Sequence, residues 1–190
     1  MDLSVKAFLG LLAFVGVTRV VEMAISRRNQ RALAARGARK IPERVFPWMV
    51  LGHAAVLAGA GLEVVTLRRP FIPPLAAAMG ALFVLATALR WWVVRTLGTH
   101  WNVQVMDSGR FGVVTTGPYG FVRHPNYVAV FVELVALPLI HTAWLTALAS
   151  AATQVLILAR RISVEEGVLL SNAEYRATMG RKARFVPGLF

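Results

Sequence analysis

The residues best suited to chemistry gather in Thr115–Tyr127, which reads TTGPYGFVRHPNY and separates two long apolar regions. The Gly-Pro pair within it signals a turn, and Pro125 restricts His124 to an extended conformation. We therefore expect Arg123 and His124 to lie on a non-helical segment just before a helix that starts near Asn126. Polar groups fixed at a helix start form a ligand site. The alternative is a basic loop that only sets membrane topology.

Further ionisable candidates lie outside this segment. Arg90 and Glu133 fall within apolar stretches, where charges are costly and tend to be functional. Arg90 could stabilise a developing anion, or it could be a snorkelling arginine in an aromatic belt. Glu133 could pair with Arg90 or act as a base. Arg161, Glu165 and Glu166 follow helical spacing near the C-terminus, where carboxylates could bind ribose hydroxyls and arginine a carboxylate.

Aromatic residues beside these groups are candidates for substrate contact, namely Trp91, His100 and Trp101. His100 and His124 lack the spacing of metal ligands, so we predict no metal. The sequence has no GxGxxG motif after a strand and no P-loop, which excludes the nucleotide sites built on those motifs. His53 is expected to be a packing histidine with its hydrogen bonds satisfied.

The composition places these residues in a membrane protein. Hydrophobic residues make up 57% of the 190 positions and charged residues only 16%, against about a quarter in soluble domains. The absence of cysteine excludes disulfides, thiolate chemistry and cysteine-based zinc sites. The net charge of +12 comes from basic residues between apolar spans, without interleaved aromatics. This placement argues against a nucleic-acid partner.

The apolar pattern predicts an all-α integral membrane fold with five transmembrane helices and a helical C-terminal tail, Arg160–Phe190. The fourth apolar segment is too short to cross a core of about 30 Å unaided. We expect it to form a helical hairpin with the fifth. Residues 1–88 would supply the N-terminal spans and residues 89–190 the functional core of a single domain, 1–190. The five predicted segments are Leu3–Met23, Trp48–Leu67, Ile72–Val94, Tyr127–Ile140 and Thr142–Ala159.

The basic residues also predict an orientation. Most of the 21 Lys and Arg residues lie in the first loop, in the connection around Thr115–Tyr127 and in the tail. The first loop contains a single acidic residue, Glu43. By the positive-inside rule these three segments face the cytoplasm and the N-terminus lies outside. Near the end of the first span, Arg19 and Glu22 are three residues apart and are expected to neutralise each other.

GPYGFVRHPNY, a short hydrophobic helix, a hairpin, RxxxEExxL and a final Arg-Phe-Val-Pro together resemble the isoprenylcysteine carboxyl methyltransferase family. The resemblance extends over roughly Leu89–Pro187. It implies an integral membrane enzyme that uses S-adenosylmethionine to methylate a lipophilic acceptor entering from the bilayer. The chain is also similar to a bacterial branch that O-methylates alkylresorcinols and alkylpyrones, which implies a bacterial cytoplasmic membrane. A phospholipid N-methyltransferase, a sterol-type reductase and a non-catalytic membrane protein are the alternatives.

The resemblance also implies roles for individual residues. Arg90 would contact the reacting group. A carboxylate acceptor needs no base, whereas a phenol or enol needs one; Glu133 and His124 are the candidates, and the base stays unassigned. The implied cofactor-binding residues are Tyr119, Arg123, His124, Pro125, Tyr127, Arg161, Glu165 and Glu166.

Overall fold

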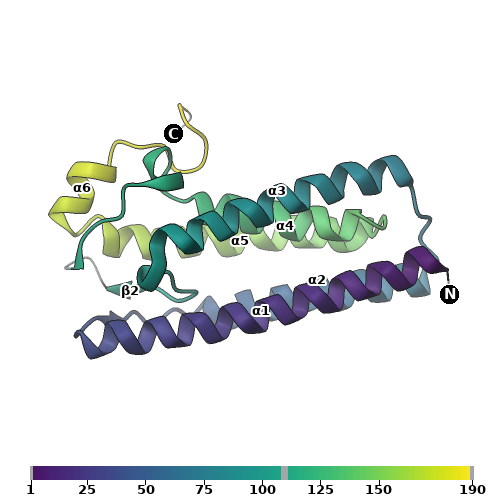
Figure 1. Cartoon of the computed structure of the whole chain (residues 1–190), viewed down its shortest axis with the longest axis horizontal. Helices are drawn as coiled ribbons and strands as arrows, with labels where there is room; N and C mark the ends of the chain where they lie inside the picture. The colour runs from purple at the N-terminus through teal and green to yellow at the C-terminus, as the bar shows by residue number, and fades with distance from the viewer. Residues whose placement is uncertain (1, 108–110, 189–190) are drawn as a thin grey trace.

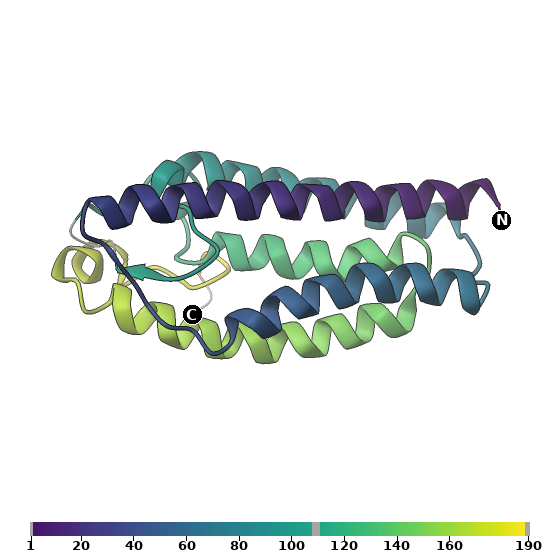
Figure 2. The same cartoon turned by 90° about the horizontal axis from the view of Figure 1, so that it is seen from below.

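The computed structural model describes residues 2–107 and 111–188 and is predominantly helical. Figure 1 shows α1 and α2 in one layer and α3, α4 and α5 in a second. From below, α1 lies over α3 and α2 lies over α5, with α4 between the two pairs (Figure 2). The helices are α1 (Leu3–Ala35), α2 (Phe46–Thr66), α3 (Pro73–Leu97), α4 (Pro125–Leu139), α5 (Trp144–Leu169) and α6 (Ala173–Met179).

Four of these helices are long and apolar enough to cross a membrane: α1, α2, α3 with its 3-10 extension η1 (Gly98–His100), and α5. The fourth helix, α4, has 15 residues and a length of about 22 Å, which is short of a bilayer core. The all-α membrane fold is therefore confirmed, but not the count of five spans. The expected hairpin is present, because α4 and α5 pack together across a short turn.

The first helix extends well beyond the predicted span. It runs to Ala35 rather than ending near Met23, so part of the basic first loop is helical. After it, β1 (Arg39–Lys40) pairs antiparallel with β2 (Met106–Asp107). This pairing ties the first loop to the connection that carries the RHPNY motif. The two segments lie at one end of the bundle together with α6, and we call this the motif end (Figure 1).

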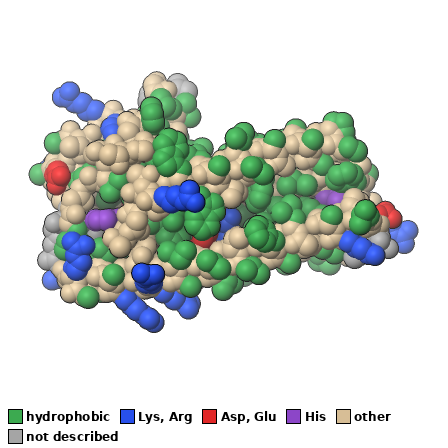
Figure 3. Space-filling model, viewed as in Figure 1, with side chains coloured by type: hydrophobic (Ala, Val, Ile, Leu, Met, Phe, Trp, Pro, Cys, Tyr) green, Lys and Arg blue, Asp and Glu red, His purple; other side chains and the backbone are tan. Residues whose placement is uncertain are grey.

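Surface side chains divide along the long axis. Lys and Arg gather mainly at the motif end, while hydrophobic side chains cover much of the rest of the visible face (Figure 3). Large apolar residues such as Phe14, Leu85 and Leu148 are exposed on the outside of the helices. Such exposure is expected where the surrounding solvent is lipid. Inside, α3 packs most extensively on α4, and buried Ala136 and Leu137 allow close approach.

At the opposite end, Glu63 on α2 stabilises the start of α5. Its carboxylate accepts the backbone N–H groups of Leu145 at 3.1 Å and Thr146 at 2.8 Å, which have no partner within their own helix. Arg69 pairs with the same carboxylate at 2.7 Å. Glu63 is thus a buried cap for the N-terminus of α5.

Gly117 lets the motif segment approach α3 closely. It opens η3 (Gly117–Gly120) with φ of 57°, and an added Cβ would lie 2.6 Å from Thr96 Oγ1. We expect Gly117→Ala to lower the free energy of unfolding by about 1–3 kcal/mol, because strain and collision add. Thermal unfolding in detergent measures this. Gly120→Ala is the control, since its Cβ would meet its nearest neighbour at an ordinary 3.6 Å; equal losses would contradict the assignment.

Candidate active site

The motif end contains a polar cavity of about 380 Å³, which is within the usual range for small-molecule sites. η3, the start of α4, the last turns of α5 and the segment after α3 form its walls. Because α5 continues to Leu169, Arg161 and Glu165 lie on this long helix and not on a separate tail helix as predicted. The candidates on the wall are His100, Trp101, Tyr119, Arg123, His124, Tyr127, Arg161 and Glu165.

Tyr127 links the α4 and α5 sides of the polar cavity. Its hydroxyl donates to the Glu165 carboxylate and accepts from Arg161 Nε at 2.9 Å. Tyr127 and Arg161 are both buried. A buried phenol between a guanidinium and a carboxylate holds all three groups in fixed positions, because breaking either bond leaves a buried polar group unpaired.

Arg161 is held in turn by the first loop. Glu43 Oε2 lies 3.3 Å from Arg161 Nη1, and Glu43 Oε1 accepts the backbone N–H of Val105 at 2.5 Å. Glu43 was not predicted as a site residue. The sequence feature that could have identified Glu43 is that it is the single acid in a strongly basic loop. A lone acid in such a loop is a candidate partner for a buried cation.

Glu166 lies behind the motif and not on the cavity wall. Its carboxylate contacts His124 Nε2 at 3.0 Å, Arg123 Nη1 at 3.1 Å and Arg184 Nη2 at 2.7 Å. Backbone hydrogen bonds add to this, since the N–H groups of residues 123 and 124 donate to the carbonyls of Ala183 and Arg184. The segment after α6 is thus fastened across the motif, which accounts for the Arg-Phe-Val-Pro sequence at this position.

Two further tyrosines on the wall of the polar cavity keep their phenol protons and can donate hydrogen bonds. Burial, with the Glu165 carboxylate nearby, raises the pKa of Tyr175 to about 12. The same two causes raise the pKa of Tyr119 above its ordinary value. Both phenols therefore stay protonated at any physiological pH. The sequence did not single out Tyr175, which lies on the short helix α6, as a site residue.

A second cavity of about 480 Å³ lies between the helices, and most of its lining residues belong to α1 and α2. We call it the apolar cavity. Exposed Val20 of α1 and Val50 of α2 belong to its wall, so it reaches the lipid-facing surface. The two cavities share a wall made of Trp101, Asn102, Asn126, Tyr127 and Arg161.

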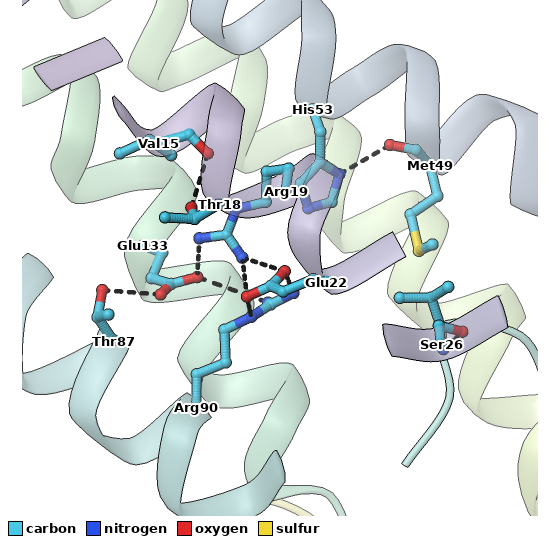
Figure 4. Close-up of polar contacts among 11 residues, drawn as sticks. Val15, Thr18, Arg19, Glu22, Ser26, Met49, His53, Thr87, Arg90 and Glu133 are labelled. Carbon is cyan, nitrogen blue, oxygen red and sulfur yellow. Dashed lines mark hydrogen bonds and ion pairs between the residues drawn. The ribbon is translucent and has the colours of Figure 1, made fainter. Parts of the chain in front are cut away.

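Four charged residues form a buried cluster beside the apolar cavity (Figure 4). Arg90 donates to both oxygens of Glu22, at 2.8 and 2.6 Å, and lies 3.5 Å from Glu133. Arg19 pairs with Glu22 at 2.8 Å and with Glu133 at 3.0 Å. We call these residues the charge quartet. Two cations and two anions balance, and Thr87 completes the shell of Glu133 at 2.9 Å.

The quartet changes the predicted roles. Arg19 and Glu22 pair as expected, but Glu22 also binds Arg90 and lines the apolar cavity together with Arg19 and Arg90. Glu133 is not on either cavity wall, because both arginines and Thr87 surround its carboxylate. Arg90 is buried rather than snorkelling. The quartet joins α1, α3 and α4, so the boundary at residues 88 and 89, inside α3, does not separate two structural units.

Polar atoms without partners mark the wall between the two cavities. Among the described residues, Trp101 Nε1, Asn102 Oδ1 and Asn126 Oδ1 are buried and make no hydrogen bond. Such orphaned groups cost about 1–3 kcal/mol each, and here all three belong to residues that line both cavities. Asn126 lies in the first turn of α4, whose N-cap is His124.

The structure thus brings most of the predicted site together. Trp101 lies on the shared wall and His100 on the polar side only. Pro125 is buried behind the motif as the first residue of α4, and Trp91 lines neither cavity.

Comparisons with known proteins agree with this arrangement. Residues 78–171 match the model of the isoprenylcysteine carboxyl methyltransferase family. Uncharacterized protein YpbQ of Bacillus subtilis is 27% identical over 161 residues, covering 84% of this chain and 94% of that protein. An uncharacterized protein of Haemophilus influenzae is 29% identical over 152 residues, covering 80% and 88%.

A solved structure has a similar fold. The eukaryotic intramembrane Ras methyltransferase ICMT matches with a TM-score of 0.56 and 23% identity, over 79% of this chain and 56% of that one. The family match includes most of α3, the whole motif segment, α4 and α5, which are the elements that build the polar cavity. The chain therefore belongs to the isoprenylcysteine carboxyl methyltransferase family of membrane methyltransferases.

Proposed function

We propose that the protein transfers a methyl group from S-adenosylmethionine to the hydroxyl oxygen of a lipophilic acceptor, with an alkylresorcinol or alkylpyrone as the favoured class. The observation that carries this proposal is the shared wall. A polar cavity at the motif end and an apolar cavity open to the lipid-facing surface meet at Trp101, Asn126, Tyr127 and Arg161. A water-soluble donor and a lipid can thus approach each other from opposite sides.

The polar cavity suits the cofactor. When bound, S-adenosylmethionine supplies a methyl group on a positively charged sulfur. Glu165 presents a carboxylate for ribose hydroxyls, and the phenols of Tyr119 and Tyr175 remain donors. Arg123 lies on the same wall, where its guanidinium can pair with a carboxylate. His124 and Pro125 shape the segment, and Glu166 holds it in place from behind.

Charge balance favours a neutral acceptor over a carboxylate. Each arginine of the quartet already faces Glu22 and Glu133, and Arg161 faces Glu43. Beside the quartet and Arg161, an incoming carboxylate would have to displace one of these anions or remain buried without a cation, and both outcomes are costly. Arg27, which also lines the apolar cavity, is exposed. A neutral hydroxyl avoids this cost and can accept hydrogen bonds from Trp101 Nε1.

The orientation follows from the same arrangement. The basic first loop, the motif connection and the C-terminal segment all lie at the motif end, so the positive-inside rule places this end in the cytoplasm, with the N-terminus outside. In a bacterial cytoplasmic membrane, the polar cavity then receives its donor from the cytosol. The acceptor enters sideways from the bilayer between α1 and α2.

Purified protein in detergent tests the proposal with labelled S-adenosylmethionine and three lipids: an alkylresorcinol, a prenylcysteine and phosphatidylethanolamine. We expect a methyl ether from the first and little product from the others. Thermal unfolding with S-adenosylhomocysteine, with NADPH and without ligand provides the binding test, and only the first should stabilise. A methyl ester or an N-methylated lipid would overturn the acceptor class, and stabilisation by NADPH alone would overturn methyl transfer.

A further inference from the structure

His53, in the middle of α2, has a defined protonation pattern. Its Nδ1 lies 2.8 Å from the carbonyl oxygen of Met49, one turn earlier. A carbonyl only accepts hydrogen bonds, so Nδ1 carries the proton and Nε2 of the neutral ring carries a lone pair. The backbone thus sets the tautomer and leaves Nε2 as the basic atom.

The ring lies on the wall of the apolar cavity together with Glu22 and Arg90, and Figure 4 shows it beside Arg19 and Glu22. Within residues 2–107 and 111–188, no hydrogen-bond partner is found for Nε2. Met49 connects this position to the shared wall, because its sulfur lies 3.2 Å from Arg161 Nη1. Met49, one helical turn before His53 on α2, thus contacts a residue of the shared wall.

Other bases near the cavities are already engaged. Glu133 is enclosed by two arginines and Thr87. His124 Nε2 is bound to Glu166 on the far side of the motif. Glu22 holds Arg90 through both oxygens, and a carboxylate paired in this way is a weak proton acceptor. His53 is the group on the apolar wall that has an unengaged basic atom.

We propose that His53 is the catalytic base that takes the proton from the acceptor's hydroxyl group. The assignment rests on the proposed function, and it applies to a hydroxyl acceptor only. The O–H bond breaks, the proton forms a new N–H bond at Nε2, and the electron pair stays on oxygen. The oxygen then bonds to the donated methyl group, whose bond to the donor sulfur breaks and leaves its electron pair on that sulfur. A neutral phenol and a neutral imidazole become a phenolate and an imidazolium, so charge is conserved.

The groups around the ring act on this change in both directions, since Glu22 favours an imidazolium at His53 while Arg19 and Arg90 oppose it. Arg19 and Glu22 face it from α1 and Arg90 from α3, while Arg161 of α5 touches the neighbouring Met49. Arg90 can attract the phenolate, and Glu22 can attract the imidazolium. Because the quartet is neutral before the transfer, neither charge has to be created beside an uncompensated charge of the same sign. The proton then leaves His53 for solvent after the product departs.

His53→Gln tests the assignment, because glutamine preserves polarity but cannot take a proton. We expect the turnover of the alkylresorcinol to fall about 10²- to 10⁴-fold, with the Kd of S-adenosylhomocysteine unchanged by calorimetry. A readout without turnover uses a long-chain alkyl nitrophenol, whose phenolate absorbs visible light. Bound beside S-adenosylhomocysteine, it should ionise about one pH unit or more higher in the variant than in the unaltered protein.

The controls separate the possible outcomes. His141→Gln makes the same substitution at the opposite end of the bundle, between Phe8 and Phe71, and should leave both readouts unchanged. If His53→Gln does not fold, His53→Ala with added imidazole replaces it, and restored turnover supports the assignment. Normal turnover and normal nitrophenol ionisation in the glutamine variant would overturn it. No methyl ether from the unaltered protein would instead overturn the proposed function.

Discussion

Arg90→Met is expected to lower the free energy of unfolding by about 3–5 kcal/mol and to abolish methyl transfer. The substitution leaves Glu22 and Glu133 with Arg19 as their only cation in the quartet, and an uncompensated buried carboxylate is costly. Unfolding in detergent, followed by circular dichroism, measures the first effect. A radiolabel assay with the alkylresorcinol measures the second.

A second variant separates stability from chemistry. Glu22→Met combined with Arg90→Met removes one charge of each sign, so the remaining pair of Arg19 and Glu133 stays neutral. The double variant should recover most of the lost stability, because buried ion pairs replaced by apolar residues of similar volume are often neutral or stabilising. We expect it to remain inactive. Restored turnover would show that Arg90 serves only to hold the helices together.

Glu165→Gln is expected to weaken S-adenosylhomocysteine binding about 10- to 150-fold, because a hydrogen bond to a charged group is worth about 1.5–3 kcal/mol. Glu165 is a carboxylate on the wall of the polar cavity, and it also accepts from Tyr127. Calorimetry measures the Kd. Glu174→Gln on α6 is the matched control, since this acid is exposed and should not affect binding.

Glu166→Gln makes the comparison sharper. The Glu166 carboxylate faces Arg123, His124 and Arg184 behind the cavity. Glu166→Gln should therefore reduce thermal stability more than Glu165→Gln does. Its effect on S-adenosylhomocysteine affinity should be the smaller of the two. The opposite ranking would show that the roles of the two glutamates are exchanged.

The sequence predicted those parts of the fold that depend on local composition. The apolar runs, the turn at Gly117-Pro118 and the short helix after His124 follow from hydropathy and from proline geometry, which act within a few residues. The predicted end of the first helix was wrong, because charged residues such as Arg27 and Arg31 are good helix formers. Their charge was interpreted as the sign of a loop, whereas α1 continues through them to Ala35.

The site was predictable where a motif carried it and unpredictable where contacts across helices created it. Arg123, His124 and Tyr127 were found because RHPNY concentrates them in one place. Glu22, Glu43 and His53 lie far from that motif in sequence, and their roles come from facing Arg90, Arg161 and a cavity. An acid in a basic loop and a histidine in a span were visible signals, but only the packing of the helices identifies their partners.

The shared wall has a thermodynamic consequence. Tyr127 and Arg161 contribute to both cavities, and both belong to one rigid group with Glu165 and Glu43. If occupancy of one cavity changes the affinity of the other by some factor, the effect must be reciprocal and equal in size. Binding of the ligand in the polar cavity would then change the affinity for the lipid, and binding of the lipid would change the affinity for that ligand by the same factor. The strength of this coupling then depends on four side chains rather than on either ligand alone.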